Sequence, residues 1–477
     1  MKKLSVYITV LLIASSCTKN LTDINTDPKS SVTAPSSALF LGAQKNLVDL
    51  YNTTSVTSAP FRVFAQVWAE NTYVTESRYI LDGVTAGFWT NIYTTAINNF
   101  EQAKTAYPTD VTDAAVLRNN RIITDILEVY SYNLLVNTYG NVPYSEAQNR
   151  TIPFPKYDDA KTIVYDLITR LDSSIAGLNT GANSLGNADQ IYKGNVAKWK
   201  KFAATLKLKL ALLIADVDAA KASTKALEAV NAGLLSSNSD NATFTFDASA
   251  VTNSNLIWQN LVNSGRHDFV PSAFFVNTLV NLNDPRLPLL VTKDPNNGYS
   301  GGIAGAGNAY GIFSDFSAQW LSPTYPADLL DYSETEFLLA EAVERGIAVG
   351  GTAESHYNNA VTASILFWGG TAASAATYLA QPTVAYTTAT GNWKQKIGYQ
   401  KWLAFANRNW DSWTEIRRLG YPNIDVVSPP VGTTSKLPLR YPYPPAEQSS
   451  NPNNWKAAVA ALPGGLDVQT AKLFWIQ

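Results

Sequence analysis

The sequence predicts a mainly α-helical protein, in which paired helices form a scaffold and carry a loop-rich, irregular insertion with minor β content. Apolar residues recur at helical spacing along long segments on both sides of the chain's middle. Between them lie short apolar runs separated by clusters of Gly, Asn and Pro, which are typical of turns. We therefore expect a helical scaffold over about residues 36–237 and 329–420, a variable loop-rich region over about 238–328, and a C-terminal loop region over about 421–477.

The first segment of the chain has the layout of an export signal. Two lysines precede an apolar run over residues 4–14, and small residues lead up to Cys17, the only cysteine in the sequence. The run is shorter than the roughly 18 apolar residues that indicate a membrane span. We expect residues 1–16 to be a lipoprotein signal peptide, Cys17 to carry the lipid, and residues 17–35 to form the anchor and a polar tether. The alternative is an ordinary secretory signal with an incidental cysteine.

The composition excludes several classes of protein. Without the two lysines of the signal segment, the 36 Lys and Arg fall to 34 against 38 Asp and Glu, a net charge of −4. This balance gives no reason to expect nucleic acid as a partner. The single cysteine rules out a disulfide within the chain, so the fold depends on packing. The 12 Trp and 24 Tyr supply large rigid faces for a core or for binding sugar rings.

One-sided apolar stripes predict the scaffold helices, because each stripe must be buried against a neighbour. Residues Ser333–Glu336 have capping-box spacing and are expected to open a helix that stops at Gly346. A last helical stretch is expected from about Trp393 through Ile416, and residues 370–391 are expected to form a loop. The stripes themselves cover residues 123–135, 164–178, 199–213 and 357–368.

Motifs for catalysis and metal binding are missing from the sequence. Its only histidines are His267, in a loop context, and His356, on a predicted helix. The sequence contains no HExxH and no GxSxG motif, and its Gly-rich run lacks the context of a phosphate-binding loop. We therefore expect no catalytic residues, no metal, no cofactor and no enzymatic activity. A surface glycosidase stays as a distant alternative, because it needs only two suitably spaced carboxylates.

Six motifs spread over most of the chain carry a family resemblance. In chain order they are NTYGNVPYSEAQNRTIPFP (137–155), YKGNVAKWKKFAATLKLKLAL (192–212), Asp284-Pro285-Arg286, DYSETEFLLAEAVERG (331–346), QKWLAFANRNWDSWTEIRRLGYP (400–422) and LPLRYPYPPAEQSSNPNN (437–454). Together they resemble the SusD/RagB family of outer-membrane lipoproteins, and most closely its SusD-like, starch-binding associated branch. Lys209 departs from the pattern, since the family more often has arginine there.

The resemblance implies both a fold and a function. The fold would be a tetratricopeptide-like scaffold of helix pairs that holds a variable loop region. The protein would be a lipid-anchored lid, facing the cell surface, on a SusC-like TonB-dependent transporter of the outer membrane. It would capture oligosaccharides for import without chemistry on the substrate. Some relatives are thought to bind oligopeptides, so a peptide ligand stays open as the alternative.

Ligand contacts are expected among aromatic and planar polar side chains in the loops, because the family's binding residues vary. An exposed ring can stack on a sugar face, while Arg binds hydroxyl groups; the competing interpretation is core packing or loop stiffening. The binding candidates are Tyr73, Arg78, Tyr79, Trp258, Arg266, Tyr299, Tyr310 and Trp320. Five tryptophans in helical contexts are expected in the core instead: Trp89, Trp199, Trp402, Trp410 and Trp413.

Basic residues near the C-terminus are expected to have structural roles. Arg417 and Arg418 are expected to bind neighbouring backbone carbonyls. Arg440 and Glu447 flank a rigid Pro/Tyr segment and are expected to pair across it.

Overall fold

The computed structural model describes residues 34–81, 83–424 and 436–477. The expected signal peptide, Cys17 and most of the tether lie outside these residues. Within the described part of the chain, no helix combines the length and apolar character that a membrane span requires. The described strands form three two-stranded antiparallel pairs, so the prediction of a mainly α-helical fold with minor β content is confirmed.

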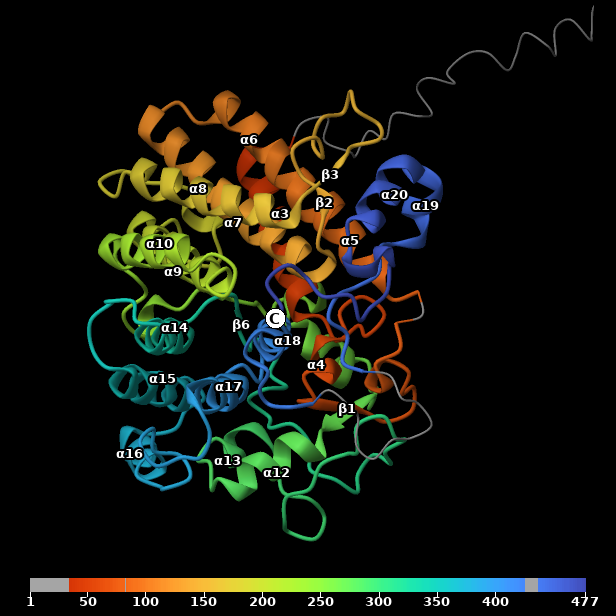
Figure 1. Cartoon of the computed structure of the whole chain (residues 1–477), viewed down its shortest axis with the longest axis vertical. Coiled ribbons are helices and arrows are strands. Elements are labelled where there is room, and N and C mark those ends of the chain that lie inside the picture. The colour runs from red at the N-terminus through yellow and green to blue at the C-terminus, as the bar shows by residue number, and fades with distance from the viewer. Residues whose placement is uncertain (1–33, 82, 425–435) are drawn as a thin grey trace, which may run out of the picture.

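Paired long helices form the scaffold, and most of them are stacked from top to bottom on the left of Figure 1. The principal pairs are α3 (Ser36–Asn52) with α6 (Asn98–Asp110), α7 (Ala114–Tyr139) with α8 (Ala160–Gly177), α9 (Val196–Leu213) with α10 (Ala219–Ala232), α14 (Tyr332–Glu344) with α15 (Ala353–Phe367), and α17 (Trp393–Ala404) with α18 (Asn409–Leu419).

Shorter elements connect the pairs or follow them. The helices are α4 (Phe61–Phe64), α5 (Thr85–Asn91), α11 (Leu256–Trp258), α12 (Ala273–Asn281), α13 (Leu287–Leu290), α16 (Ala372–Leu379), α19 (Pro445–Ser450) and α20 (Pro452–Ala460). Two π-helical turns are η2 (Ile92–Ile97), which joins α5 to α6, and η6 (Gln259–Asn263). The strand pairs are β1 (Trp68–Glu70) with β5 (Phe269–Pro271), β2 (Val142–Pro143) with β3 (Tyr157–Asp158), and β4 (Thr243–Phe244) with β6 (Ala327–Asp328).

Asp and Asn side chains cap several scaffold helices, including α7, α8 and α9. At α14 the cap is Asp331, whose carboxylate accepts a hydrogen bond from the backbone N–H of Glu334. The expected capping box at Ser333 is therefore wrong. Ser333 already lies in the first turn, and its hydroxyl donates to the carbonyl of Ala360 on α15.

Three segments differ from the helix boundaries expected from the sequence. The stretch from Trp393 to Ile416 is two helices, because the chain turns at residues 405–408 and Arg408 adopts a non-helical conformation before α18. The expected loop at 370–391 contains α16, which begins with a reciprocal cap between Thr371 and Ser374. The expected C-terminal loop region contains α19 and α20, each with a proline in its first turn.

The apolar stripes of the scaffold helices form the core, as expected. The stripe over residues 123–135 is fully buried in α7, and the stripes of α8 and α9 pack into the same cluster. The five tryptophans assigned to the core from helical context are at most 7% exposed. Both predictions are confirmed.

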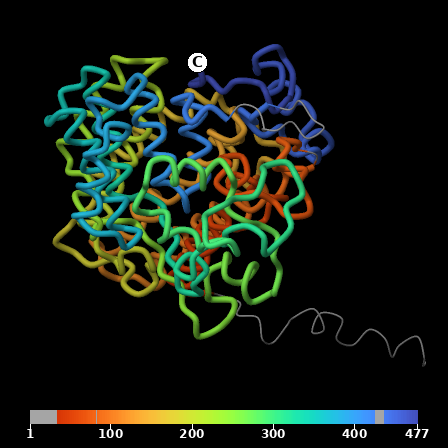
Figure 2. The backbone as a smooth tube through the Cα atoms, turned by 90° about the horizontal axis from the view of Figure 1, so that it is seen from below, coloured from red at the N-terminus to blue at the C-terminus, as the bar shows by residue number. Residues whose placement is uncertain are grey.

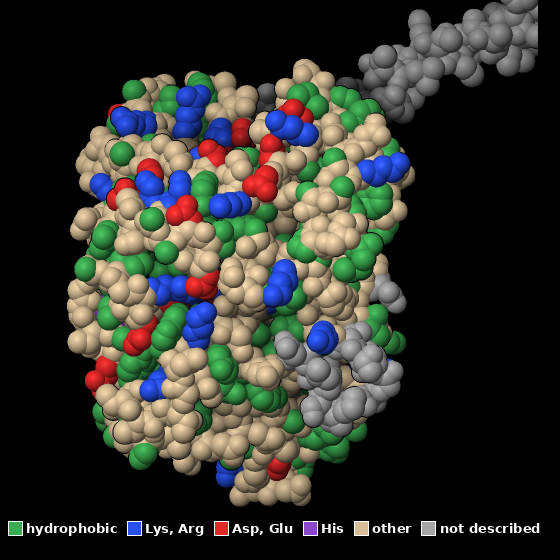
Figure 3. All heavy atoms as spheres, viewed as in Figure 1, with side chains coloured by type: hydrophobic (Ala, Val, Ile, Leu, Met, Phe, Trp, Pro, Cys, Tyr) green, Lys and Arg blue, Asp and Glu red, His purple; other side chains and the backbone are tan. Residues whose placement is uncertain are grey.

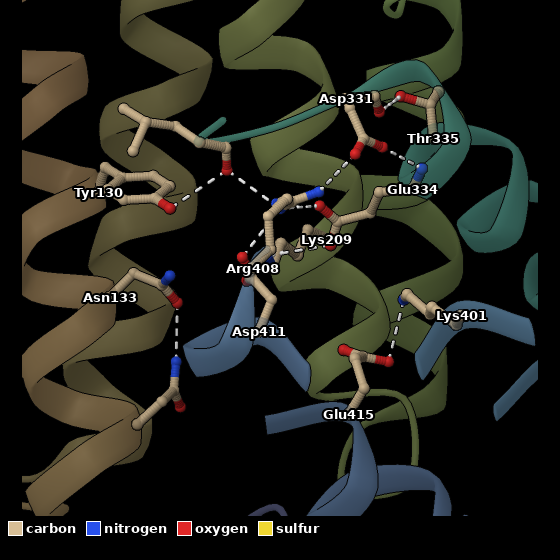
Figure 4. A network of polar contacts seen from close by, with 12 residues as sticks. Tyr130, Asn133, Lys209, Asp331, Glu334, Thr335, Lys401, Arg408, Asp411 and Glu415 are labelled. Carbon is tan, nitrogen blue, oxygen red and sulfur yellow. Dashed lines mark hydrogen bonds and ion pairs between the residues drawn. The ribbon is translucent and has the colours of Figure 1, made fainter. Parts of the chain in front are cut away.

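Charged side chains are also buried inside the scaffold, where they form a network shown in Figure 4. Lys209 on α9 contacts Asp411 and lies 3.0 Å from a carboxylate oxygen of Glu334. Arg408 contacts the same two carboxylates and lies 3.2 Å from Asp331. Burial alone would raise the pKa of Glu334, but the charges of Arg408 and Lys209 outweigh it and lower this pKa to about 2. We call these five residues the buried charge network; it links α9, α14 and α18.

Arg417 is bound to backbone carbonyls, as expected. Its guanidinium donates to the carbonyls of Asn137 and Leu439, which fastens α18 to the end of α7. The same expectation is wrong for Arg418, which binds the carboxylate of Glu341 on α14 and that of Glu415.

The expected pairing of Arg440 with Glu447 is wrong. The Arg440 side chain is fully buried, where it donates to the carbonyl of Tyr139 and pairs with Asp467 at 2.6 Å. Glu447 instead accepts a hydrogen bond from the hydroxyl of Tyr157. Tyr139 and Tyr157 come from a distant part of the chain and Asp467 lies beyond the Pro/Tyr segment, so spacing within that segment did not indicate these partners.

The β1–β5 pair attaches the loop-rich region to the N-terminal scaffold. Trp68 lies opposite Pro271 and Glu70 opposite Phe269. Seen from below in Figure 2, the green loop-rich segment lies in the foreground beside the red N-terminal one. The segments that leave this strand pair therefore emerge together at the surface.

Candidate ligand-binding surface

The most strongly perturbed ionisable groups do not form a functional site. Arg408 and Glu334 are at most 2% exposed, so no ligand reaches them. In the ranges that the structure describes, His, Cys, Asp and Glu side chains form no cluster of three that could hold a metal ion. A ligand must therefore be bound at the surface.

Three adjoining hollows lie around the β1–β5 pair, and we call them together the loop-region surface. The first measures about 350 Å³ and is lined by Tyr73, Asn260 and Arg266, among others. The second, of about 240 Å³, shares Arg266 with the first. The third, of about 300 Å³, shares Tyr310 and Asp315 with the second. A row of connected hollows suits an extended ligand better than a compact one.

Backbone hydrogen bonds bring the three lining segments together. Beyond Glu70, Asn71 donates from its backbone N–H to the carbonyl of Asp268 at 2.8 Å and from its side chain to that of His267 at 2.6 Å. Asn308 donates from its backbone N–H to the carbonyl of Asn71 and from its side chain to that of Glu70. The loops are therefore held in place by a strand pair and by buried amide groups.

Glycine allows the loop of residues 301–308 to lie against β5. A Cβ on Gly301 would be 2.4 Å from the carbonyl carbon of Ser272, and one on Gly302 would be 2.6 Å from a methyl group of Val270. Real Cβ atoms essentially never approach so closely. The small residues in this Gly-rich run thus have a packing role that positions Tyr310.

Two tyrosine rings are presented on this surface. Tyr73 is 73% exposed and Tyr310 is 48% exposed. The ring of Tyr310 stacks on that of His267, with centroids 3.7 Å apart and planes 11° from parallel. Between them, Arg266 is oriented by Asp268, whose carboxylate lies 2.7 Å from the guanidinium Nε. Aromatic faces beside an oriented guanidinium are suited to binding a ring that bears hydroxyl groups.

Glu70 is one of two acidic residues in the wall of the first hollow, the other being Asp268. Burial raises its pKa to about 7, although its carboxylate accepts hydrogen bonds from the backbone N–H and the hydroxyl of Ser77. The neighbouring Glu76 raises this pKa further. Below neutral pH Glu70 is therefore mostly uncharged, and the charged groups left in this wall are the paired Arg266 and Asp268. Figure 3 likewise shows charged side chains gathered over the upper part of its face, where α7–α10 lie, and fewer over the loop-rich part below.

The structure brings three of the eight binding candidates together. Tyr73, Arg266 and Tyr310 line the loop-region surface. Arg78 lies nearby, but its Nε donates to the carbonyl of Gly305 at 2.8 Å, so it holds the loop that carries Tyr310.

Two other candidates are corrected by their burial. Tyr79 is fully buried and its hydroxyl donates to the carbonyl of Ile424. Trp320 is fully buried and its indole N–H donates to Asn407. Neither side chain can contact a ligand at this surface. Trp258 and Tyr299 are half-buried and do not line these three hollows, and Tyr299 packs against the core.

Several lining residues were missed by the sequence-based prediction. Asn260 comes from the π-helical turn η6, where it donates to the hydroxyl of Thr54. His267 was considered only as a catalytic base, whereas here it supports Tyr310. The GRHD segment at 265–268 was the available signal, because it places polar side chains in a loop of an otherwise Gly- and Asn-rich region. Nothing in the sequence indicated that Thr54 and its neighbours line the first hollow.

Comparison with known proteins gives a consistent result. Residues 28–444 match the family model "SusD-like_2: Starch-binding associating with outer membrane". No curated protein sequence matches the chain. Among solved structures, one named "chitin-binding protein" is 26% identical, with a TM-score of 0.80 over 93% of this chain and 100% of that one.

Further solved structures share the fold. A SusD homologue from Bacteroides uniformis is 26% identical, with a TM-score of 0.77 over 92% of this chain and 99% of its own. A chitin-binding SusD homologue from Flavobacterium johnsoniae is 23% identical, with a TM-score of 0.77 over 91% and 98% of the two chains; at this identity only the fold is compared.

Proposed function

The chain belongs to the SusD-like family of starch-binding proteins that associate with the outer membrane, and we propose that it captures oligosaccharides on its loop-region surface. The observation that carries this proposal is the exposed pair Tyr73 and Tyr310, the latter backed by His267, on either side of Arg266.

Binding would depend on shape and hydrogen bonding. The axial C–H groups of a pyranose ring pack on the faces of Tyr73 and Tyr310, while Arg266 and Asn260 bind hydroxyl groups. On binding, the polar groups of the protein and the hydroxyl groups of the sugar give up hydrogen bonds to water and form hydrogen bonds to each other. Specificity for one sugar therefore comes from the placement of these groups rather than from net charge. No bond of the ligand is made or broken in this scheme.

Delivery to a SusC-like TonB-dependent transporter completes the proposal. The protein would act as a lid, held at the cell-surface side of the outer membrane by a lipid on Cys17. A lipid and a short polar segment would let the lid move while it stays near its transporter. This part of the proposal is supported by the outer-membrane association of the family.

The other two hypotheses have less support. Binding of an oligopeptide would be favoured by unpaired backbone groups at the surface. Around the first hollow, however, the amide groups of Asn71 and Asn308 already form hydrogen bonds with neighbouring backbone carbonyls. A glycosidase would need two free carboxylates in a cleft. In the first hollow both carboxylates are occupied, Asp268 by Arg266 and Glu70 by Ser77.

The test is a binding screen of the chain from residue 18 onward against glycan and peptide panels. The panels include α-glucans and oligomers of N-acetylglucosamine, because the family is described as starch-binding and a similar structure as chitin-binding. Tyr73→Ala and Tyr310→Ala should each weaken binding about tenfold or more, which corresponds to about 1.4 kcal/mol or more. Leu366→Ala, which truncates an exposed apolar side chain on α15, serves as the control. Equal responses to every glycan, or unchanged affinity in both tyrosine variants, would contradict the proposal.

A further inference from the structure

We propose that a separate hollow, enclosed by α5, η2, the 143–155 segment and α19, is a second oligosaccharide-binding site. We call it the proline-lined hollow. It measures about 640 Å³, whereas the largest hollow of the loop-region surface measures about 350 Å³. The inference rests on the proposed function, because it assigns the same class of ligand to a second place. The two sites share no lining residue.

The walls of the proline-lined hollow are joined to one another by hydrogen bonds. The hydroxyl of Tyr93 on η2 donates to the carbonyl of Pro143 at 2.6 Å. On the opposite side, the side-chain amide of Asn451 donates to the carbonyl of Pro155 at 2.8 Å. Glu447, which lines the hollow, accepts a hydrogen bond from the hydroxyl of Tyr157. The hollow is therefore formed before any ligand arrives, which lowers the entropic cost of binding.

The floor of the proline-lined hollow is aromatic. Trp89 lies in edge-on or tilted contact with Tyr93, Tyr157 and Tyr443, with ring centroids 5.1 to 6.2 Å apart. Trp89 and Tyr93 both line the hollow, and both sit on the helix that is interrupted by the π-turn η2. Such turns occur often at functional sites, because they change the direction of a few side chains within a helix. The other π-turn, η6, contributes Asn260 to the loop-region surface.

The rim carries planar polar groups that have no partner in the described part of the chain. Arg150 is exposed and forms neither a hydrogen bond nor an ion pair with another described residue, and the same holds for the side chain of Asn98. Arg440, by contrast, is paired with Asp467. The acidic lining residue, Glu447, is already bound by Tyr157. The free donors are thus a guanidinium and an amide, which match the hydroxyl groups of an uncharged sugar.

The walls favour a sugar over an extended peptide. Extended peptides are bound mainly through hydrogen bonds to backbone groups. Here Pro143, Pro153, Pro155 and Pro444 line the hollow and have no N–H to donate. The carbonyls of Pro143 and Pro155 already accept hydrogen bonds from side chains. What the prolines offer instead is apolar C–H surface, against which a pyranose ring packs.

Binding stoichiometry measured by titration calorimetry tests this inference. The probes are maltohexaose, the hexamer of N-acetylglucosamine, and a Gly-Ser hexapeptide, each titrated into the chain from residue 18 onward. Two variants act on the proline-lined hollow: Arg150→Ala removes the free guanidinium, and Ala446→Trp fills the space from the exposed start of α19. Arg121→Ala is the matched control, because Arg121, on α7, is also exposed and forms no ion pair with another described residue. Tyr310→Ala acts only on the loop-region surface.

We expect one of the hexasaccharides to bind at two sites per chain. Ala446→Trp should reduce the stoichiometry to one, and Arg150→Ala should weaken only the second site, about tenfold. Tyr310→Ala should weaken only the first site, and Arg121→Ala should change neither. Circular dichroism and melting curves confirm that each variant is folded.

The outcomes separate failure of the inference from failure of the proposed function. One site per chain that responds to Tyr310→Ala but not to Ala446→Trp would overturn the second site and leave the proposed function intact. Binding that responds only to Ala446→Trp would support the proline-lined hollow and contradict the assignment of the loop-region surface. Binding of the hexapeptide alone, blocked by Ala446→Trp, would overturn the assignment to a sugar. Absence of binding by both hexasaccharides would contradict the two proposals together.

Discussion

Replacing Lys209 with methionine tests whether the buried charge network holds the scaffold together. Methionine keeps the unbranched shape and most of the length of the side chain and removes its charge. The Lys209 side chain is 7% exposed, and the carboxylates of Glu334 and Asp411 are fully buried. The variant therefore leaves these two carboxylates, together with Asp331, to share Arg408 as their cation.

The expected loss follows from these contacts. Removing one partner from a buried ion pair costs about 3–5 kcal/mol, because the remaining charge is left uncompensated. Arg408 still contacts both carboxylates, so we expect the lower end, about 3 kcal/mol of the free energy of unfolding. Lys209 also helps to hold the pKa of Glu334 at about 2, below its usual 4.5. The resulting stability is present above pH 4.5 and is lost as the pH falls toward 2, and in the variant, whose Glu334 pKa is less depressed, this loss is smaller and ends at a higher pH.

Urea denaturation of the chain from residue 18 onward measures the effect. Far-ultraviolet circular dichroism and tryptophan fluorescence should give coincident transitions before a free energy is extracted. The matched control is Lys45→Met, which breaks an ion pair with Asp49 whose side chains are 27% and 22% exposed; such pairs contribute about 0–1 kcal/mol. Lys209→Arg keeps the charge and should lose less than Lys209→Met. If Lys209→Met costs no more than Lys45→Met, the reasoning about burial is wrong.

Three further outcomes are expected. Cys17→Ser should leave folding and ligand affinity unchanged while the protein is lost from the cell surface, as fractionation and surface labelling can measure; loss of the fold would contradict the anchor hypothesis. Glu70→Gln should gain stability relative to the wild type as the pH rises from 4.5 to 7 and then remain constant, because the folded wild type holds a proton there that the unfolded chain releases; equal pH dependence of urea midpoints would contradict the raised pKa. Gly301→Ala should cost about 1–3 kcal/mol and weaken binding at the loop-region surface, since its Cβ meets the backbone of Ser272. Gly307→Ala, whose Cβ comes no nearer than 3.6 Å to another atom, should be close to neutral in thermal melting and in calorimetry.

The sequence was sufficient for the helical scaffold, because helical periodicity is a local property. The apolar stripe over residues 123–135 indicates which face of α7 must be buried, whichever element packs against it. The joint order of the family motifs likewise indicated the fold from residue 137 to residue 454. Helix ends were less certain: Asp331 rather than Ser333 caps α14, and α17 ends at Ala404, before Arg408 joins the buried charge network.

For the loops the sequence was a weaker guide, because it did not show which of the candidate binding residues are exposed and which are buried. Tyr73 and Tyr79 lie six residues apart in one loop, yet one is 73% exposed and the other is fully buried. Tyr79 is held by the carbonyl of Ile424, more than 300 residues away. A loop has no period that relates a residue's position to its exposure, so only the contacts of the folded chain decide it.

The sequence by itself therefore determined most of the long scaffold helices, the single cysteine at residue 17 and the membership of a family. Tertiary structure alone decided which aromatic rings face solvent, because that depends on the β1–β5 pair, on the close approach at Gly301, and on hydrogen bonds such as that between Asn308 and Glu70. The proline-lined hollow likewise depends on the tertiary structure. Its walls come from segments near residues 90, 150 and 447, and such distant segments become a site only when the chain is folded.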